Sequence, residues 1–128
     1  MAHPTMFDPD DPVLARLRKV ALALPGADEK ISHGRPAFFT KKIFAGYGAV
    51  VKGDHRSSQY DQALVFMPDT DEAAALEGDE RFFTPAYWGP YGWLGLDLSG
   101  KVDWEEVEEL LTDSFRLTAP KKLLKELD

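Results

Sequence analysis

Residues 81–98 read RFFTPAYWGPYGWLGLDL, and this stretch holds six of the chain's 15 aromatic residues. Glycine and proline interrupt its middle, which favours a tight turn over a continuous strand or helix. We therefore predict two strands, 82–87 and 92–98, joined by a turn that carries rings. Leu94, Leu96 and Leu98 alternate with other residues in the second strand, as expected where one face of a sheet is buried.

The rings of this stretch suit two roles. Large rings supply much apolar area at low conformational entropy, so they serve both in cores and in binding sites. We expect Phe82, Phe83 and Trp93 to pack in the core. For Tyr87, Trp88 and Tyr91, which lie beside the turn, packing and ligand binding both stay open.

The residues before this stretch predict a helix followed by three strands. Asp11 as N-cap and Pro12 at the first helical position open a helix that ends at Pro25-Gly26. Strand-like periodicity then predicts strands at 36–39 and 43–51, with a basic tip at Lys41 and Lys42, and a third strand at 59–67.

Two further helices are indicated by capping boxes, in which an N-cap residue is followed three positions later by glutamate. Asp69 with Glu72 predicts a short helix that ends at Gly78, and Asp103 with Glu106 predicts a longer amphipathic helix over 103–115. A last short helix is predicted at 121–127. The element order indicates an α+β fold, an antiparallel sheet with helices packed on one face.

Length and composition indicate one domain, 11–128, after a flexible tail at residues 1–10. The chain has no cysteine, which excludes disulfides and thiolate chemistry. It has no apolar run long enough to cross a membrane, and its first residues lack the pattern of a secretory signal. We expect a cytoplasmic protein without membrane partners.

The net charge of −7 conceals a strong asymmetry. Residues 30–56 carry six basic side chains and one acidic one, whereas residues 57–115 carry two basic and fourteen acidic ones. The overall charge opposes generic nucleic-acid binding, but the basic segment offers a local exception.

No catalytic or metal-binding pattern emerges. His3, His33 and His55 lack the spacing of zinc ligands. Ser32 and His33 are adjacent on an extended segment, so their side chains point in opposite directions and cannot form a catalytic pair. The carboxylates of 105–109 spread around the polar face of a helix. We expect no enzymatic activity, no metal and no cofactor.

Three blocks of sequence closely resemble the MmcQ/YjbR family of small bacterial proteins. They are SHGRPAF at 32–38, GPYGW at 89–93, and the segments VDW, SFR and APKK between 102 and 122. The resemblance covers roughly residues 10–124. It implies a CyaY-like fold, similar to bacterial frataxin, and a DNA-binding role through two hairpins arranged as a double wing.

Three functions follow as hypotheses. The first is DNA binding that weakens steeply with salt, through Arg35, Lys41, Lys42, Lys52, His55 and Arg56. The second is a small-molecule or peptide site at the aromatic turn 87–93, formed by Tyr87, Trp88 and Tyr91 with Arg35 or His33. The third is an interaction module in which the acidic helix 103–115 meets a basic protein partner.

Overall fold

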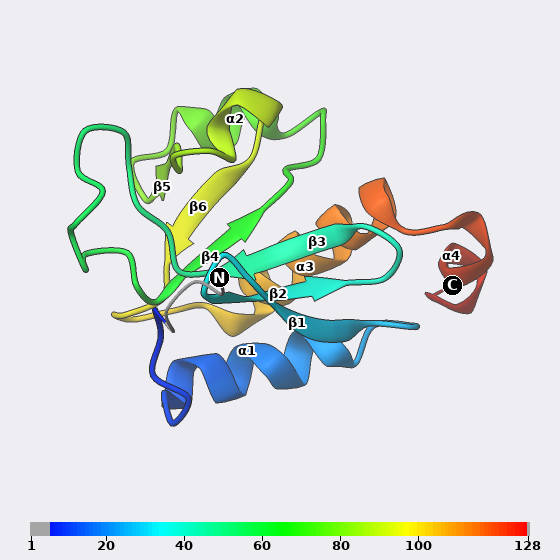
Figure 1. The fold of residues 1–128 in the computed structure, drawn as a ribbon. Helices are drawn as coiled ribbons and strands as arrows, with labels where there is room; N and C mark the ends of the chain where they lie inside the picture. The colour runs from blue at the N-terminus through cyan, green and yellow to red at the C-terminus, as the bar shows by residue number, and fades with distance from the viewer. Residues whose placement is uncertain (1–5, 128) are drawn as a thin grey trace.

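Six antiparallel strands form one sheet in the computed structural model, which describes residues 6–127 (Figure 1). The strands are β1 (Asp28–Ser32), β2 (Arg35–Phe39), β3 (Ile43–Tyr47), β4 (Ala63–Phe66), β5 (Phe82–Phe83) and β6 (Leu94–Asp97). Their order in space is β1-β2-β3-β4-β6-β5. The chain therefore runs as a meander to β4 and then places β6 between β4 and β5.

Two long helices, α1 (Pro12–Leu22) and α3 (Trp104–Thr118), share one hydrophobic core with the sheet. Phe44 of β3 and Phe115 of α3 meet edge to face, with ring centroids 5.6 Å apart. Figure 1 shows α3 behind the sheet and α1 below β1 and β2, so neither long helix covers the face toward the viewer. The α+β class predicted from the sequence is confirmed. Two short helices, α2 (Ala73–Glu77) and α4 (Lys121–Leu127), complete the described chain.

A β-bulge in β3 lies where the sheet contacts α3. Phe38 pairs with Ala45 while Phe39 pairs with Ile43, so Phe44 is an extra residue on β3. The buried hydroxyl of Ser114 donates to the carbonyl oxygen of Phe44 and accepts a hydrogen bond from the Met67 N–H at 3.0 Å. Ser114 thus joins α3 to β3 and to the end of β4.

The predicted N-caps of both long helices are present. Asp103 accepts hydrogen bonds from the N–H groups of Glu105 and Glu106 at 3.0 and 3.3 Å. Asp11 is buried, and its carboxylate accepts bonds from the Val13 N–H and the Gln62 amide at 2.9 and 3.0 Å and from the Tyr47 hydroxyl. Burial acts to raise the pKa of Asp11, but these hydrogen bonds outweigh it and hold the pKa below its usual range.

The predicted capping box at Asp69 and Glu72 is wrong. Asp69 accepts from the Asp71 N–H at 2.8 Å in a turn that precedes the helix, and α2 begins at Ala73 with no side-chain hydrogen bond at its N-cap. Leu76 of α2 packs against the core, but no residue of α2 is fully buried, so little packing supports a helix longer than Ala73–Glu77.

β1 is a strand that the sequence did not predict. It is a polar edge strand, DEKIS, held by pairing with β2 rather than by an apolar pattern. The predicted strands are also too long. β3 ends at Tyr47 because Gly48 has a φ of +85°, and β5 ends at Phe83, before Tyr87 at φ +71°. The strands predicted at 59–67 and 92–98 are regular only over 63–66 and 94–97.

Part of the predicted N-terminal tail, and His3 within it, lies outside the described residues. Within the described part of the tail, the Met6 N–H donates to the carbonyl oxygen of Gly34, in the turn between β1 and β2, at 2.9 Å.

Candidate functional site

Small residues form a row across the face of the sheet opposite to the helices. Ala37 pairs with Gly46, Gly46 with Val65, and Val65 with Gly95. Where a side chain is missing, a ring takes its place: a Cβ on Gly46 would lie 3.4 Å from the Trp88 ring, and one on Gly95 would lie 2.3 Å from the Phe83 ring. The glycines therefore let aromatic rings lie directly on the backbone of the sheet.

The segment between β5 and β6 places its rings over this row. The Ala86 N–H donates to the carbonyl oxygen of Val50 at 2.8 Å, which ties the segment to the β3–β4 loop. A short 3-10 helix, Gly89–Tyr91, then reverses the chain, and Gly92 ends it at φ +86°. The rings of Trp88 and Trp93 lie on either side of this helix in sequence and 4.8 Å apart in space.

The outer rings of the segment are exposed to solvent. Tyr87 is 71% exposed and Tyr91 is 77% exposed, the largest values among the exposed large apolar residues of the described chain. The Tyr87 hydroxyl and Nδ1 of His55 lie 2.9 Å apart, and the two rings meet edge to face. This contact connects the aromatic turn with the β3–β4 loop.

Arg35 lies nearby at the start of β2. Its side chain is 15% exposed, and Nη2 is 3.3 Å from the carboxylate of Asp61. The guanidinium rests against Gly48, where a Cβ would lie 2.2 Å from Nη1. Nη1 is buried and has no hydrogen-bond partner within residues 6–127. Arg35 is thus a partly buried cation whose Nη1 donor is unused.

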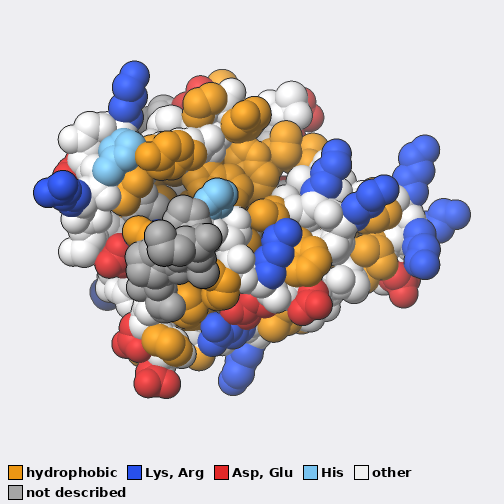
Figure 2. All heavy atoms as spheres, viewed as in Figure 1, with side chains coloured by type: hydrophobic (Ala, Val, Ile, Leu, Met, Phe, Trp, Pro, Cys, Tyr) orange, Lys and Arg blue, Asp and Glu red, His pale blue; other side chains and the backbone are white. Residues whose placement is uncertain are grey.

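These side chains line one cavity of about 740 Å³. Its lining includes His33, Arg35, His55, Tyr87, Trp88 and Tyr91. Within the described chain, the two non-glycine residues with positive φ are His33 at 51° and Tyr87 at 71°, and both line this cavity. Backbone strain of this kind gathers at functional sites. We call this cavity the aromatic groove; Figure 2 shows apolar side chains gathered on this face, with lysine and arginine around them.

The groove contains residues from both binding hypotheses. All four residues of the alternative ligand site, His33, Tyr87, Trp88 and Tyr91, line it, together with Arg35 and His55 from the predicted DNA-binding set. Trp93 also lines the groove and is half-buried, so the expectation that it packs in the core is wrong. Phe82 is in the core as expected, whereas Phe83 is half-buried and stacks on Tyr60 at 3.8 Å.

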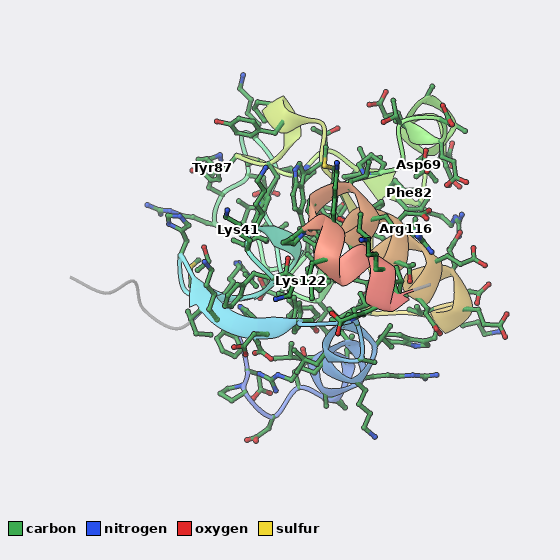
Figure 3. The ribbon with its side chains drawn as sticks, turned by 90° about the vertical axis from the view of Figure 1, so that its right-hand side faces the viewer. Lys41, Asp69, Phe82, Tyr87, Arg116 and Lys122 are labelled. Atoms are coloured by element: carbon green, nitrogen blue, oxygen red, sulfur yellow. The ribbon has the colours of Figure 1, made fainter. Side chains whose placement is uncertain are left out.

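The remaining predicted DNA-binding residues occupy two separate loops. Lys41 and Lys42 are exposed in the turn between β2 and β3, while Lys52 and Arg56 are exposed in the loop between β3 and β4. Because β3 connects the two loops, they lie at opposite ends of the sheet (Figure 1). Figures 1 and 3 place Lys41 at the end of the molecule that also carries Lys122 of α4.

The acidic helix lies away from the groove. Figure 3 shows Tyr87 on one side of the molecule, with Asp69 and Arg116 on the other. Glu106 binds Arg81 at 2.8 Å, and Glu105, Glu108 and Glu109 are exposed. Over residues 6–127, no group of three histidine, aspartate or glutamate side chains is arranged to hold a metal ion. In the same residues, no helix has the length and apolar character needed to cross a membrane.

The fold and the groove define a small α+β protein whose antiparallel sheet has one helix-covered face and one open face that carries a cavity. The YjbR family model matches residues 22–117, so the chain belongs to the YjbR family. The crystal structure of Deinococcus radiodurans protein DR2400, whose domain is designated DUF419, has a similar fold. Its TM-score is 0.65 at 21% sequence identity, and the match covers 89% of this chain and 86% of that one. No curated protein matches the chain.

The sequence alone did not identify several apolar residues that line the groove. Ile43, Ala49 and Val50 line the cavity and carry no signal that separates them from ordinary strand residues. Gly46 and Gly48 did carry such a signal, because a pair of glycines within a strand marks bulges and close approaches of other groups.

Proposed function

We propose that this protein is a non-enzymatic binding protein whose aromatic groove takes a small, largely apolar ligand. The observation that carries the proposal is the convergence of exposed rings and strained residues on one cavity. Tyr87 and Tyr91 are kept in solvent at 71% and 77% exposure, and Tyr87 keeps this place at the cost of a positive φ. A merely structural turn requires neither feature.

The size and chemistry of the groove support the same proposal. Small-molecule sites enclose about 300–1,000 Å³ and combine apolar and aromatic walls with a few polar groups, and the groove of about 740 Å³ falls in this range. Its polar groups come from separate elements and include Ser32 of β1, His33 from the β1–β2 turn, Arg35 of β2 and His55 from the β3–β4 loop.

Titration with N-phenyl-1-naphthylamine, a neutral probe that fluoresces in apolar sites, tests the proposal. We expect saturable binding to the parent protein, about tenfold weaker binding to Trp88→Ala, since base-sized rings stacked on an aromatic side chain contribute about 1–3 kcal/mol, and a smaller loss in Tyr91→Ser. Leu117→Ser is the matched control, because Leu117 is an exposed apolar residue on α3, 42% exposed, outside the groove. An equal loss in this control, or no saturable binding to the parent, would contradict the proposal.

DNA binding is a second candidate function. It is supported by the exposure of Lys41, Lys42, Lys52 and Arg56 and by the presence of Lys122 near Lys41. Since the two basic loops lie at opposite ends of the sheet, a single duplex that contacts both would have to run along the length of β3. Each neutralised phosphate would add about one unit to the salt dependence of log affinity.

Binding of a labelled duplex at low and moderate salt tests this candidate. We expect Lys41→Glu/Lys42→Glu and Lys52→Glu/Arg56→Glu each to lower affinity about tenfold or more at low salt, because each removes two phosphate contacts. Lys19→Glu/Lys101→Glu makes the same change in net charge at exposed positions elsewhere. If all three variants lose affinity equally, net charge and not the loops governs binding, and the candidate fails.

A further inference from the structure

The charge of the aromatic groove differs from the charge of the protein. The chain carries 22 aspartate and glutamate residues and a net charge of −7, yet no acidic side chain lines the groove. The charged and titratable side chains of its lining are one arginine, two histidines and tyrosines. A second cavity of about 330 Å³ shows the contrast, since Glu80, Asp97, Asp103 and Glu106 all line it. A cavity without carboxylates in so acidic a protein suits an anion.

Arg35 supplies the donor that an anion would use. Nη2 of Arg35 donates to the carboxylate of Asp61 over 3.3 Å, which is long for a hydrogen bond. The side chain of Asp61 is itself 45% exposed. Nη1 is buried without an acceptor in the described chain. A buried donor left unpaired costs about 1–3 kcal/mol, more for a charged group, so a shift of the guanidinium that brings Nη1 to an acceptor in the cavity would remove this cost. Carboxylate, sulfonate and phosphate oxygens match the guanidinium best.

The walls determine the shape of the remaining part of the ligand. Trp88 lies against the backbone of Gly46, and the rings of Trp88 and Trp93 are tilted by 42° to each other. Tyr87 and Tyr91 stand at the solvent side. Rings arranged in this way accept a flat partner by offset or edge-to-face contact.

We propose that the ligand of the groove is a planar aromatic molecule with one anionic group, whose rings pack against Trp88 and Tyr91 while the anion pairs with Arg35. This inference rests on the proposed binding function and names the ligand class. It assigns Arg35 the role of distinguishing an anion from a neutral molecule of the same shape.

Two probes that share one ring framework test this inference. 8-Anilinonaphthalene-1-sulfonate is N-phenyl-1-naphthylamine with one added sulfonate. A purely apolar groove in a protein of net charge −7 would prefer the neutral probe, because the sulfonate adds desolvation cost and repulsion. We expect the opposite, with the sulfonate bound about tenfold more tightly by the parent protein, which corresponds to about 1.4 kcal/mol.

The outcomes separate the inference from the function on which it rests. Equal or weaker binding of the sulfonate overturns the inference and leaves the binding function intact, whereas failure of both probes overturns both. This comparison needs only the parent protein, so it holds even if a variant does not fold.

Variants then locate the anion site. Arg35→Met keeps the length of the side chain and removes its charge, so the ratio of the two probe affinities should shift toward the neutral probe and the preference for the sulfonate should disappear. Lys41→Met/Lys42→Met removes two charges at the far end of β3 and should keep the preference. If Arg35→Met retains the full preference, Arg35 does not hold the anion and the inference is wrong.

Competition distinguishes a small molecule from a nucleic acid, which also presents flat rings and anions. Thymidine monophosphate and oligothymidylate are compared as competitors of the sulfonate probe at equal nucleotide concentration. A small-molecule site predicts that the oligomer competes no better than the monomer. Much stronger competition by the oligomer would assign the groove to single-stranded nucleic acid and overturn the proposal.

Discussion

Replacing Gly48 with alanine tests how the fold holds Arg35 in the groove. A Cβ at this position would lie 2.2 Å from Arg35 Nη1 and 3.0 Å from the carbonyl oxygen of Asp61, on a backbone with φ +85°. A left-handed backbone costs an L-residue about 1–2 kcal/mol. Crowding against a packed side chain and a backbone oxygen costs about 1–3 kcal/mol more. Gly48→Ala should therefore lower the free energy of unfolding by about 2–5 kcal/mol.

Gly53 provides a control with nearly the same backbone conformation. Its φ is +88°, and nothing lies within 4 Å of a Cβ built there. Gly53→Ala should therefore carry the backbone cost alone, about 1–2 kcal/mol. Urea unfolding followed by far-ultraviolet circular dichroism gives both values, and their difference measures the crowding against Arg35 and the Asp61 carbonyl oxygen.

Equal losses of stability in the two variants would refute this reasoning, because they would show that Arg35 moves away from Gly48 without cost. The two naphthalene probes give a second readout. Gly48→Ala should reduce the preference for the sulfonate, since the guanidinium can no longer occupy its place, whereas Gly53→Ala should keep it.

Two further predictions concern the polar contacts that hold the helices to the sheet. Ser114→Ala removes the hydroxyl that joins Phe44 and Met67 and should lower the free energy of unfolding by about 1–3 kcal/mol; Thr112→Ala, which removes a hydroxyl bonded only within α3, should change it less in the same urea assay. The pKa of Asp11 is lower in the folded protein than in the unfolded chain, so its stabilising contribution is complete above about pH 4 and is lost as the pH falls through the folded value. The difference in unfolding free energy between the parent and Asp11→Asn should therefore shrink between pH 7 and pH 3, and a constant difference would contradict it.

Local signals made the long helices predictable. Asp11 and Asp103 satisfy the N–H groups of their own first turns, and the amphipathic pattern of each helix follows its buried face. Asp69 presents the same local pattern, and the helix predicted to end at Gly78 is present, but it begins only at Ala73 because Asp69 bonds within a preceding turn. The capping-box pattern thus indicated this helix but not its first residue.

The strand and the site that the sequence could not predict depend on contacts between separate segments of the chain. β1 is polar and is held in the sheet by its antiparallel pairing with β2 over Asp28–Ser32. The groove depends on the contact of Ala86 with Val50 and on that of Tyr87 with His55, which join segments more than 30 residues apart. The ligand-site hypothesis already combined Arg35 with Tyr87 and Trp88, but His55 was predicted only for DNA binding, since nothing in the sequence reveals that it shares their cavity.

The fold places the basic and the acidic segments of the sequence in different parts of the molecule. The basic segment 30–56 forms most of β2 and β3 and the loops at both ends of β3, so it frames the groove, while the acidic helix packs behind the sheet. At physiological ionic strength, exposed charges act over about 8 Å. An anion at the groove therefore feels Arg35 more strongly than the carboxylates of α3, so added salt should weaken binding of the sulfonate probe despite the net charge of −7. If the net charge governed instead, salt would strengthen that binding by screening the repulsion, and the sign of the salt effect decides between the two.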